Sequence, residues 1–343
     1  MKTVVFRADS SLVIGTGHLM RCLTLADALY KRGVNSHFLT RDLEGSASEI
    51  IVERGFGLHV LSTDGPEPVR SLTAQLNADW LVVDNYRLDA TWERVARPAN
   101  TKVAVIDDLA DRKHDCALLL DQNLGRAKGD YEALVSQNTV QLLGPEFAML
   151  RAEFLDARDD ALKFRAQPKS KNVLINFGGA DPHSIASKTL SQLETLDDFN
   201  FKIILGGAVR NHEHIQSLAQ MVQAEVITNT SNMAELMRQA DVAIGAAGST
   251  AWERCCLGLP TGMVILADNQ RMLAHAIEDA GAGAVLADLT QSDDLSQVEE
   301  FLTRCQTDIG FLNEMSENAA RLIDGKGVER VVDAMINLDA IHE

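Results

Sequence analysis

Short apolar runs alternate with amphipathic stretches along most of the chain. In the first half we expect strands at 3–8, 37–40, 58–61, 80–84, 102–106 and 117–120. After the first strand, Leu19, Cys22, Leu23 and Ala26 recur at the i, i+3, i+4, i+7 spacing of a helix, and Gly33 follows as its expected C-cap. Strands that alternate with helices predict βα units and a parallel sheet.

The pattern changes at 151–171, where charged residues dominate and no strand is expected. We interpret this segment as an interdomain linker. A second βα series follows, with strands expected at 172–177, 201–205, 225–227, 242–245, 261–266 and 284–286. The sequence therefore predicts an α/β protein of two Rossmann-like domains facing a cleft. The N-terminal domain would span 1–150, the second 172–305, and a helical tail 306–343.

Composition narrows the class of partner. The 343 residues include 49 Asp plus Glu against 32 Lys plus Arg, a formal charge of −17, which argues against nucleic acid or an anionic membrane as a partner. The start of the chain does not resemble a secretory leader, and no apolar run approaches the roughly 20 residues that span a bilayer. We expect a cytoplasmic protein, monomeric or weakly homo-oligomeric.

The five cysteines have neither CxxC spacing nor nearby histidines at ligand spacing. Neither a disulfide framework nor a structural zinc site is indicated. Cys255 and Cys256 are adjacent in a helix expected to be buried, where packing is their expected role.

The segment RADSSLVIGTGHLMR, at 7–21, places His18 where the first strand turns into a helix. Gly15 and Gly17 would let the backbone take positive φ and approach a ligand closely, and the first amides of the helix could hold an anion. A histidine has an ordinary pKa of about 6.5, so an imidazole at the rim of such a site is a candidate general base. The alternative is that His18 only caps the helix, or bonds a neighbouring carbonyl in a loop that binds nothing.

Two glycine-bearing turns follow strands in the second half. FGGADP, at 177–182, contains Gly178 and Gly179, and IGAAGSTAWE, at 244–253, contains Gly248, Ser249 and Thr250. Backbone amides and hydroxyls at the start of a helix suit a diphosphate, whereas the alternative is simple cap geometry. Taken together, turns of this kind in two domains favour a nucleotide site at the carboxyl ends of the strands.

Other polar residues lie at expected strand ends or in loops. Glu253 could accept hydrogen bonds from a ribose, or could only stabilise its helix dipole. We expect Tyr86, Asn269 and Gln270 to orient a substrate, since polar residues in cleft loops often do so. Asp84 lies near them, while the adjacent Asp107 and Asp108 are expected to form a solvated turn.

The motifs together resemble one family, the UDP-2,4-diacetamido-2,4,6-trideoxy-β-L-altropyranose hydrolases of pseudaminic acid biosynthesis, which have a glycosyltransferase-B-like fold and serve flagellin glycosylation. The resemblance runs in order from residue 2 to about residue 286. It rests on Arg7-x-Asp9, Ile14-Gly15-x-Gly17-His18-x-x-Arg21, Asp84-x-Tyr86, Gly144, Met149-Leu150-Arg151, Phe154, Phe177-Gly178-Gly179-x-Asp181, Gly248-Ser249-Thr250-x-x-Glu253 and Asn269-Gln270.

The resemblance implies an inverting hydrolase that needs no metal or cofactor. Water would attack the anomeric carbon of a UDP-sugar, and UDP would leave. His18 matches the catalytic base, and Asp9 and Tyr86 would hold His18 or the sugar. The resemblance assigns substrate binding to Gly15, Gly17, Arg21, Gly178, Gly179, Gly248, Ser249, Thr250, Glu253, Asn269 and Gln270.

Three alternatives share these features. A glycosyltransferase of the same fold would pass the sugar to an acceptor instead of water. A non-catalytic protein would bind the nucleotide sugar without turnover. A hydrolysing UDP-sugar epimerase would invert C2 and would use carboxylates to do so.

Overall fold

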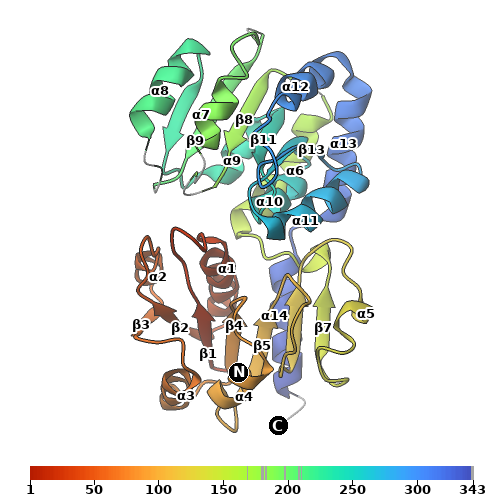
Figure 1. Cartoon of the computed structure of the whole chain (residues 1–343). Helices are drawn as coiled ribbons and strands as arrows, with labels where there is room; N and C mark the ends of the chain where they lie inside the picture. The colour runs from red at the N-terminus through yellow and green to blue at the C-terminus, as the bar shows by residue number, and fades with distance from the viewer. Residues whose placement is uncertain are drawn as a thin grey trace. The chain divides into compact units, whose positions relative to one another are not determined.

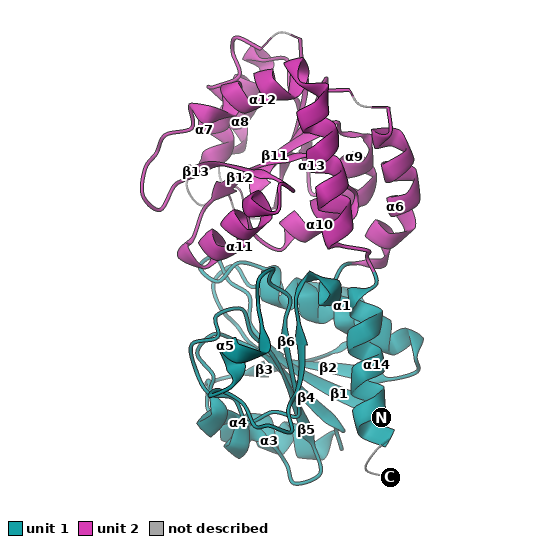
Figure 2. Cartoon of the chain, turned by 90° about the vertical axis from the view of Figure 1, so that its right-hand side faces the viewer, with its two compact units in different colours: residues 1–150, 326–343 teal, residues 151–325 magenta. Residues whose placement is uncertain are grey.

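The chain folds into two compact units. The computed structural model describes residues 1–167, 169–178, 181, 184–196, 198–207, 209 and 211–340. The first unit contains residues 1–150 and 326–343, and the second contains residues 151–325 (Figure 2). Each unit is built around its own parallel sheet. Within the described residues, no helix combines the length and apolar character needed to cross a bilayer.

The first unit contains a seven-stranded parallel sheet in the order β3-β2-β1-β4-β5-β6-β7 (Figure 1). Its strands are β1 (Thr3–Ala8), β2 (Asn35–Arg41), β3 (Gly57–Leu61), β4 (Trp80–Asp84), β5 (Lys102–Ile106), β6 (Leu118–Asp121) and β7 (Val140–Leu143). Its helices are α1 (Gly17–Lys31), α2 (Glu49–Glu53), α3 (Pro66–Gln75), α4 (Ala90–Ala96), α5 (Lys128–Tyr131), the 3-10 turn η1 (Pro145–Phe147) and α14 (Gly327–Ala340).

Helix α1 packs on this sheet by the stripe that its sequence predicted. The side chains of Leu19, Cys22, Leu23 and Ala26 are fully buried, together with Phe6 of β1. Gly33 adopts φ +78° just after the helix, as expected of a C-terminal glycine. The stripe therefore fixes which face of α1 meets the sheet.

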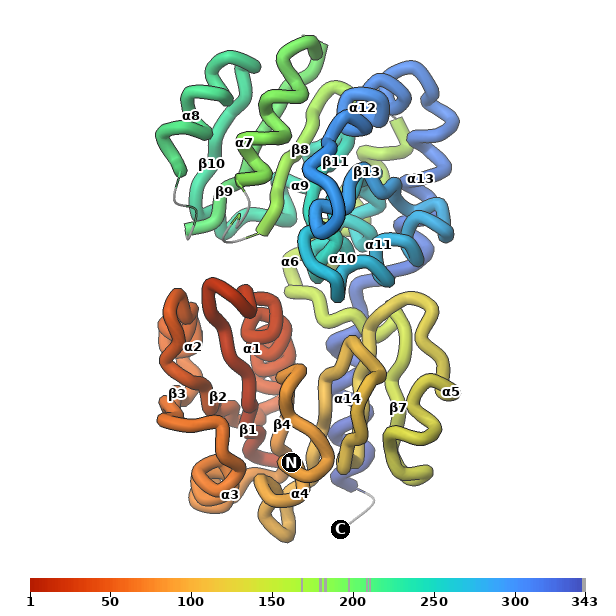
Figure 3. Tube along the Cα trace, in the orientation of Figure 1, coloured from red at the N-terminus to blue at the C-terminus, as the bar shows by residue number. Residues whose placement is uncertain are grey.

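Helix α14 belongs to the first unit although it ends the chain. Val331, Val332 and Met335 are buried in the same core as Leu19. Figure 3 shows α14, at the blue end of the tube, within the first unit. The helices expected in the tail at 306–343 are present, but the tail is divided between the two units. Its first part contains the end of α12 and all of α13, which belong to the second unit. From residue 326 on, the chain belongs to the first unit again. The apolar spacing predicted a helix around Val331 but carried no information about which core it would join.

The second unit contains a six-stranded parallel sheet in the order β10-β9-β8-β11-β12-β13. Its strands are β8 (Asn172–Asn176), β9 (Asn200–Leu205), β10 (Glu225–Thr228), β11 (Val242–Ala246), β12 (Thr261–Ile265) and β13 (Ala284–Asp288). Its helices are α6 (Ala152–Arg165), α7 (Ile185–Leu190), α8 (His212–Met221), α9 (Met233–Gln239), α10 (Thr250–Cys256), α11 (Asp268–Asp279), α12 (Gln297–Thr307) and α13 (Ile309–Leu322).

The segment expected as a linker, 151–171, contains helix α6 and is part of the second unit. Arg165 is buried and donates from Nη2 to the carbonyl oxygens of Met237 (2.8 Å) and Ala240 (3.2 Å). Arg158 donates to the carbonyl oxygen of Ala320 at 2.7 Å. The charges that suggested a solvated linker instead satisfy backbone carbonyls, so an apolar stripe is largely missing from this helix.

The twelve expected strands are present, with ends displaced by two residues at most. Strand β7 was not expected. It is a four-residue strand at the edge of the first sheet, and of its side chains only that of Leu142 is buried. So short a run carries too little apolar patterning to stand out from the loops beside it.

Candidate active site

Each sheet has one point where the strand order reverses, and open α/β sheets bind ligands there, outside the carboxyl ends of the strands. In the first unit this point lies between β1 and β4, which run side by side with Ala8 opposite Asp84. In the second unit it lies between β8 and β11. The loops that follow β1 and β4 are therefore the candidate site of the first unit, and the loops that follow β8 and β11 are that of the second.

His18 lies in the first turn of α1, and its side chain is 10% exposed. Its Nδ1 is 2.6 Å from Oδ1 of Asp84, the last residue of β4. The N-cap of α1 is Thr16, so His18 does not serve as the helix cap. The imidazole instead links the first turn of α1, the helix that follows β1, to the end of β4.

Asp84 is held as a carboxylate by Arg21, one turn further along α1. Arg21 donates from Nε to Oδ2 and from Nη2 to Oδ1 of Asp84, both at 2.6 Å. Burial opposes ionisation, but the charge of Arg21 and the hydrogen bonds outweigh it, and the pKa of Asp84 lies well below its usual range. Because a carboxylate only accepts, Nδ1 of His18 carries the proton. In the neutral ring Nε2 is then the atom with the lone pair, as a general base requires.

A second carboxylate lies behind this pair. Arg21 donates from Nη1 to Oδ2 (2.8 Å) and Oδ1 (3.0 Å) of Asp108. The hydroxyl of Tyr86 donates to the same Oδ2 at 2.8 Å. The ring of Tyr86 packs edge-on against His18, with centroids 4.6 Å apart and an interplanar angle of 79°. Burial and the nearby Asp108 carboxylate raise the pKa of Tyr86, so its hydroxyl stays protonated.

The expectation that Asp107 and Asp108 form a solvated turn is wrong. The side chain of Asp108 is only 14% exposed. Asp107 is fully buried and accepts hydrogen bonds from Arg112 Nη1 and from the hydroxyl of Tyr131, both at 2.9 Å. Asp107 therefore pairs with Arg112, whereas Asp108 pairs with Arg21.

The loop before α1 is a short hairpin closed by backbone hydrogen bonds between Ser11 and Gly15. Gly15 adopts φ +78°, as expected, but Gly17 does not have positive φ and is the first residue of α1. Ser11 Oγ accepts from the amides of Val13 (3.2 Å) and Ile14 (2.9 Å). The side chain of Val13, at the tip, is 95% exposed.

Asp9 lies at the end of β1 but is engaged elsewhere. Its carboxylate accepts from Arg7 (2.6 and 2.8 Å) and from the backbone amide of Arg41 (2.9 Å). These partners outweigh burial and lower the pKa of Asp9. Its contacts do not include His18. The acid that contacts the imidazole is Asp84, to which the sequence analysis had assigned no role in the site.

In the second unit, the expected phosphate turn lies between β11 and α10, with Ser249 exposed at the start of the helix. Gln270, expected as a substrate contact, lies beside it, since a β-carbon added to Gly248 would be 3.7 Å from Nε2 of Gln270. The Oε1 of Gln270 accepts from the amide of Leu266 at 3.0 Å. Gln270 is thereby brought to the turn that contains Gly248, Ser249 and Thr250.

A buried arginine supports this turn from within. Arg254 donates to the carbonyl oxygen of Ala246 (2.7 Å) and to Oγ1 of Thr250 (3.1 Å). Burial lowers its pKa to about 10, so it remains charged at neutral pH. A β-carbon at Gly245 would lie 2.7 Å from Nη1 of Arg254, so this arrangement requires glycine there.

Glu253 lies one turn into α10, with its side chain 14% exposed. Its Oε1 accepts from Nη2 of Arg151 at 3.0 Å. Burial raises the pKa of Glu253, although the charge of Arg151 opposes that rise. A carboxylate in this position is suited to accept hydrogen bonds from a diol.

The remaining predicted residues lie at the other loops of the second unit. Gly178 adopts φ +92° just after β8, and Asp181 accepts from the amide of Ile185 at 2.7 Å at the start of α7. Gly179 lies outside the described residues. Asn269 is exposed in the first turn of α11.

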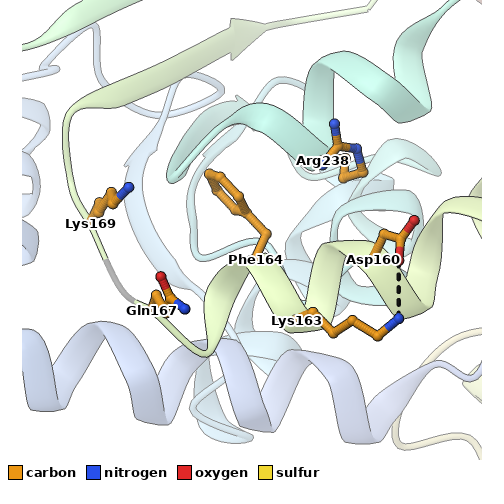
Figure 4. Close-up of a pocket in the computed structure, with 6 residues that line it drawn as sticks. All are labelled: Asp160, Lys163, Phe164, Gln167, Lys169 and Arg238. Carbon is orange, nitrogen blue, oxygen red and sulfur yellow. Dashed lines mark hydrogen bonds and ion pairs between the residues drawn. The ribbon is translucent and has the colours of Figure 1, made fainter.

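A surface cavity of the second unit lies away from these loops (Figure 4). It is formed by the C-terminal end of α6, by α9 and by the segment before β8. This is the amino end of the strands, opposite to the glycine turns. The residues that line it are Asp160, Lys163, Phe164, Gln167, Lys169 and Arg238.

The cysteines are all buried and free, as their expected packing role requires. Among the described residues, no three His, Cys, Asp or Glu side chains are grouped so that they could hold a metal ion.

Comparison with solved structures defines the class of fold. MurG of Acinetobacter baumannii aligns with a TM-score of 0.73 at 17% identity, covering 98% of this chain and 100% of that one. Staphylococcus aureus MnaA in complex with UDP aligns with a TM-score of 0.61 at 12% identity, covering 97% and 95%. Residues 177–332 match the glycosyltransferase family 28 C-terminal domain. The protein has the two-domain GT-B fold, which confirms the predicted pair of Rossmann-like domains.

The sequence is similar to proteins with three different names. It is 26% identical to the UDP-2,4-diacetamido-2,4,6-trideoxy-β-L-altropyranose hydrolase of Campylobacter jejuni, over 81% of this chain and 97% of that protein. It is 24% identical to the spore coat polysaccharide biosynthesis protein SpsG of Bacillus subtilis, over 96% and 97%. It is 26% identical to MJ1062 of Methanocaldococcus jannaschii over 76% of this chain, which spans about half (55%) of that relative. The resemblance seen in the motifs is confirmed.

Sequence reasoning missed the roles of Asp84 and Asp108. Both lie at the ends of apolar strands, and this position was the available signal. Which acid reaches His18 depends on β1 pairing with β4, and the sequence pattern does not give the order of strands in a sheet.

Proposed function

We propose that this protein is a nucleotide-sugar hydrolase in which His18 is the general base. The observation that carries the proposal is the 2.6 Å contact between Nδ1 of His18 and Asp84. It orients the ring and leaves Nε2 as the basic atom, at the point of the first sheet where ligands of open α/β proteins bind.

The reaction would proceed by direct displacement. A water molecule gives one proton to Nε2 of His18 while its oxygen forms a bond to the anomeric carbon. The bond between that carbon and the diphosphate oxygen breaks, and UDP leaves with the electron pair. Because water enters opposite the leaving group, the configuration at the anomeric carbon inverts. General base catalysis of this kind contributes typically ~10²-fold to 10⁴-fold in rate.

The second unit would hold the nucleotide. The turn containing Gly248, Ser249 and Thr250 would contact the diphosphate through amides and hydroxyls. Glu253 would accept from the ribose hydroxyls, in competition with its contact to Arg151. Support comes from the solved MnaA structure of the same fold, which contains UDP.

The proposed substrate is a UDP-linked 2,4-diacetamido-2,4,6-trideoxy sugar, which would place the protein in pseudaminic acid biosynthesis. This rests on the motif resemblance and on the Campylobacter jejuni hydrolase, whose similarity covers 97% of that protein. A panel of such sugars tests it. NMR during the reaction should show which anomer of the free sugar appears first, and inversion predicts the anomer opposite to that of the substrate.

The first prediction concerns H18N. This variant should release UDP at least about 10²-fold more slowly than the natural protein, because it removes the base, while the Kd for UDP changes less than about 3-fold. Coupled-enzyme detection of UDP and isothermal titration calorimetry measure the two quantities. H59N is the matched control. His59 is half-buried on β3 and contacts His37 of β2, away from His18. Turnover by H18N close to that of H59N would rule out the general-base assignment.

A glycosyltransferase is the second candidate, favoured by the match of residues 177–332 to the family 28 C-terminal domain and by the similarity to MurG. The same assay separates the two. Release of UDP and free sugar without any acceptor supports the hydrolase. Release that requires an added acceptor alcohol supports the transferase.

A further inference from the structure

Asp108 lies directly behind the proposed base without touching it. Its carboxylate accepts from two side chains that each reach His18. One is Arg21, which donates to both Asp108 oxygens at 2.8 and 3.0 Å and to both Asp84 oxygens at 2.6 Å. The other is Tyr86, which donates to Asp108 at 2.8 Å and packs its ring against the imidazole.

Arg21 and Tyr86 restrict the imidazole in different ways. Arg21 fixes the plane of the Asp84 carboxylate, because a guanidinium that bridges two carboxylates has no freedom to rotate. Asp84 in turn fixes the rotation of the ring through Nδ1. The ring of Tyr86 packs against the imidazole, with the two ring centroids 4.6 Å apart. If Asp108 loses its charge, both Arg21 and Tyr86 lose the carboxylate that holds them.

Asp108 also balances charge around the base. The ionisable groups that face His18 and its partner Asp84 are Arg21 and Cys22 from α1, Tyr86 after β4 and Asp108 after β5. Burial and the adjacent carboxylate raise the pKa of Cys22 well above its usual range, and Tyr86 is likewise neutral. With neutral His18 the cluster carries one positive and two negative charges. Protonation of His18 therefore brings it to neutrality.

We propose that Asp108 is a positioning residue for His18, acting through Arg21 and Tyr86 to fix the orientation of the His18–Asp84 pair. This inference rests on the proposed function, since it assigns Asp108 a role in the same site. Asp107 provides the contrast, because the preceding carboxylate contacts Arg112 and Tyr131 instead.

The test compares D108N with D107N. NMR of ¹⁵N-histidine-labelled protein, assigned with H18N, reports which ring nitrogen of His18 carries the proton and needs no substrate. In D108N we expect a mixture of the two tautomers, because Arg21 and Tyr86 no longer hold the His18–Asp84 pair in one orientation. D107N should keep the ring-nitrogen pattern of the natural protein, even if it is less stable.

Kinetics provide the second readout. In D108N, kcat should fall about 10-fold to 100-fold, the range typical for loss of a group that orients a reactive side chain, while KM changes less than about 3-fold. A folded D108N that keeps the natural kcat and the natural ring-nitrogen pattern of His18 overturns the proposal.

If D108N does not fold, the D108E variant provides the test. D108E keeps the negative charge but moves it by one methylene. We expect a kcat at least about 10-fold lower than that of the natural protein, because Arg21 and Tyr86 are displaced. A natural kcat in D108E overturns the proposal. If the natural protein releases no UDP from any sugar, the proposed function fails, and the NMR comparison still judges the role of Asp108.

Discussion

The carboxylate of Asp84 decides which nitrogen of His18 is basic. It lies 2.6 Å from Nδ1 and is kept ionised by two hydrogen bonds from Arg21. A proton on Nδ1 and a lone pair on Nε2 follow from that charge, since a carboxylate has no proton to donate. The chemistry of the site thus depends on an acid that does not itself contact water or substrate in the proposed reaction.

The D84N variant tests this dependence. An asparagine amide can donate to Nδ1, so the ring would carry its proton on Nε2 and lose its function as a base. We expect kcat for UDP release to fall by about 10³-fold or more, as when the orienting acid of a histidine base is made neutral. Steady-state kinetics at saturating substrate measure it, with D107N as the control. A D84N enzyme within about 10-fold of D107N would contradict the tautomer argument.

At the scale of elements, α14 shows how the end of the chain completes the first core. Val331, Val332 and Met335 pack with residues of α1. Two ion pairs tie the end of this helix to the sheet, since Asp339 contacts the amino group of Met1 and, at 3.0 Å, Lys102. The first unit therefore depends on a segment that follows the whole second unit in sequence.

The start of α14 tolerates no side chain. A β-carbon at Gly327 would lie 2.2 Å from the carbonyl oxygen and 2.6 Å from the nitrogen of Ala148, both backbone atoms that cannot move aside. We expect G327A to lower the free energy of unfolding by about 1–3 kcal/mol, as overpacking does. Urea denaturation followed by circular dichroism measures it.

Gly129 is the control for this substitution. It lies in α5 without positive φ, and a β-carbon there would meet no atom within 4 Å. G129A should be neutral or stabilising by up to about 1 kcal/mol. Equal denaturation midpoints for G327A and G129A would show that α14 can shift away from Ala148.

At the scale of the whole molecule, the two units differ in the number of buried acids whose pKa is lowered. In the first unit Asp9, Asp84 and Asp107 are almost fully buried, and arginine partners outweigh burial and lower the pKa of each. Burial raises the pKa of one other buried acid there, Asp121, to about 6. In the second unit the pKa of Glu253, mostly buried beside Arg151, is raised by burial. The stability of the first unit should therefore depend more steeply on acid.

The direction of this pH dependence of stability follows from proton linkage. A carboxyl whose pKa is lower in the folded state stabilises the fold fully above its ordinary pKa of about 4, and that stabilisation is lost as the pH falls through the folded value. Below about pH 4 we expect the first unit to lose protection before the second in hydrogen exchange measured by mass spectrometry. Loss of protection in the second unit first would contradict this.

Much of the fold could be predicted from the chain alone. Apolar runs located twelve strands, and the stripe from Leu19 to Ala26 gave the buried face of α1, because burial on a sheet or helix demands these periods. Helix α6 was missed since Arg158 and Arg165 use their charges on backbone carbonyls, which leaves a charged pattern like that of a linker.

The sequence by itself determined the two βα series and located His18 and the glycine turns at the starts of helices, because these features depend on neighbouring residues. Only the tertiary structure decided that Asp84, and not Asp9, contacts the imidazole, and that Asp108 anchors Arg21. It also decided that α14 returns to the first unit. Such contacts join residues far apart along the chain, and they depend on the order of strands, which the local pattern does not encode.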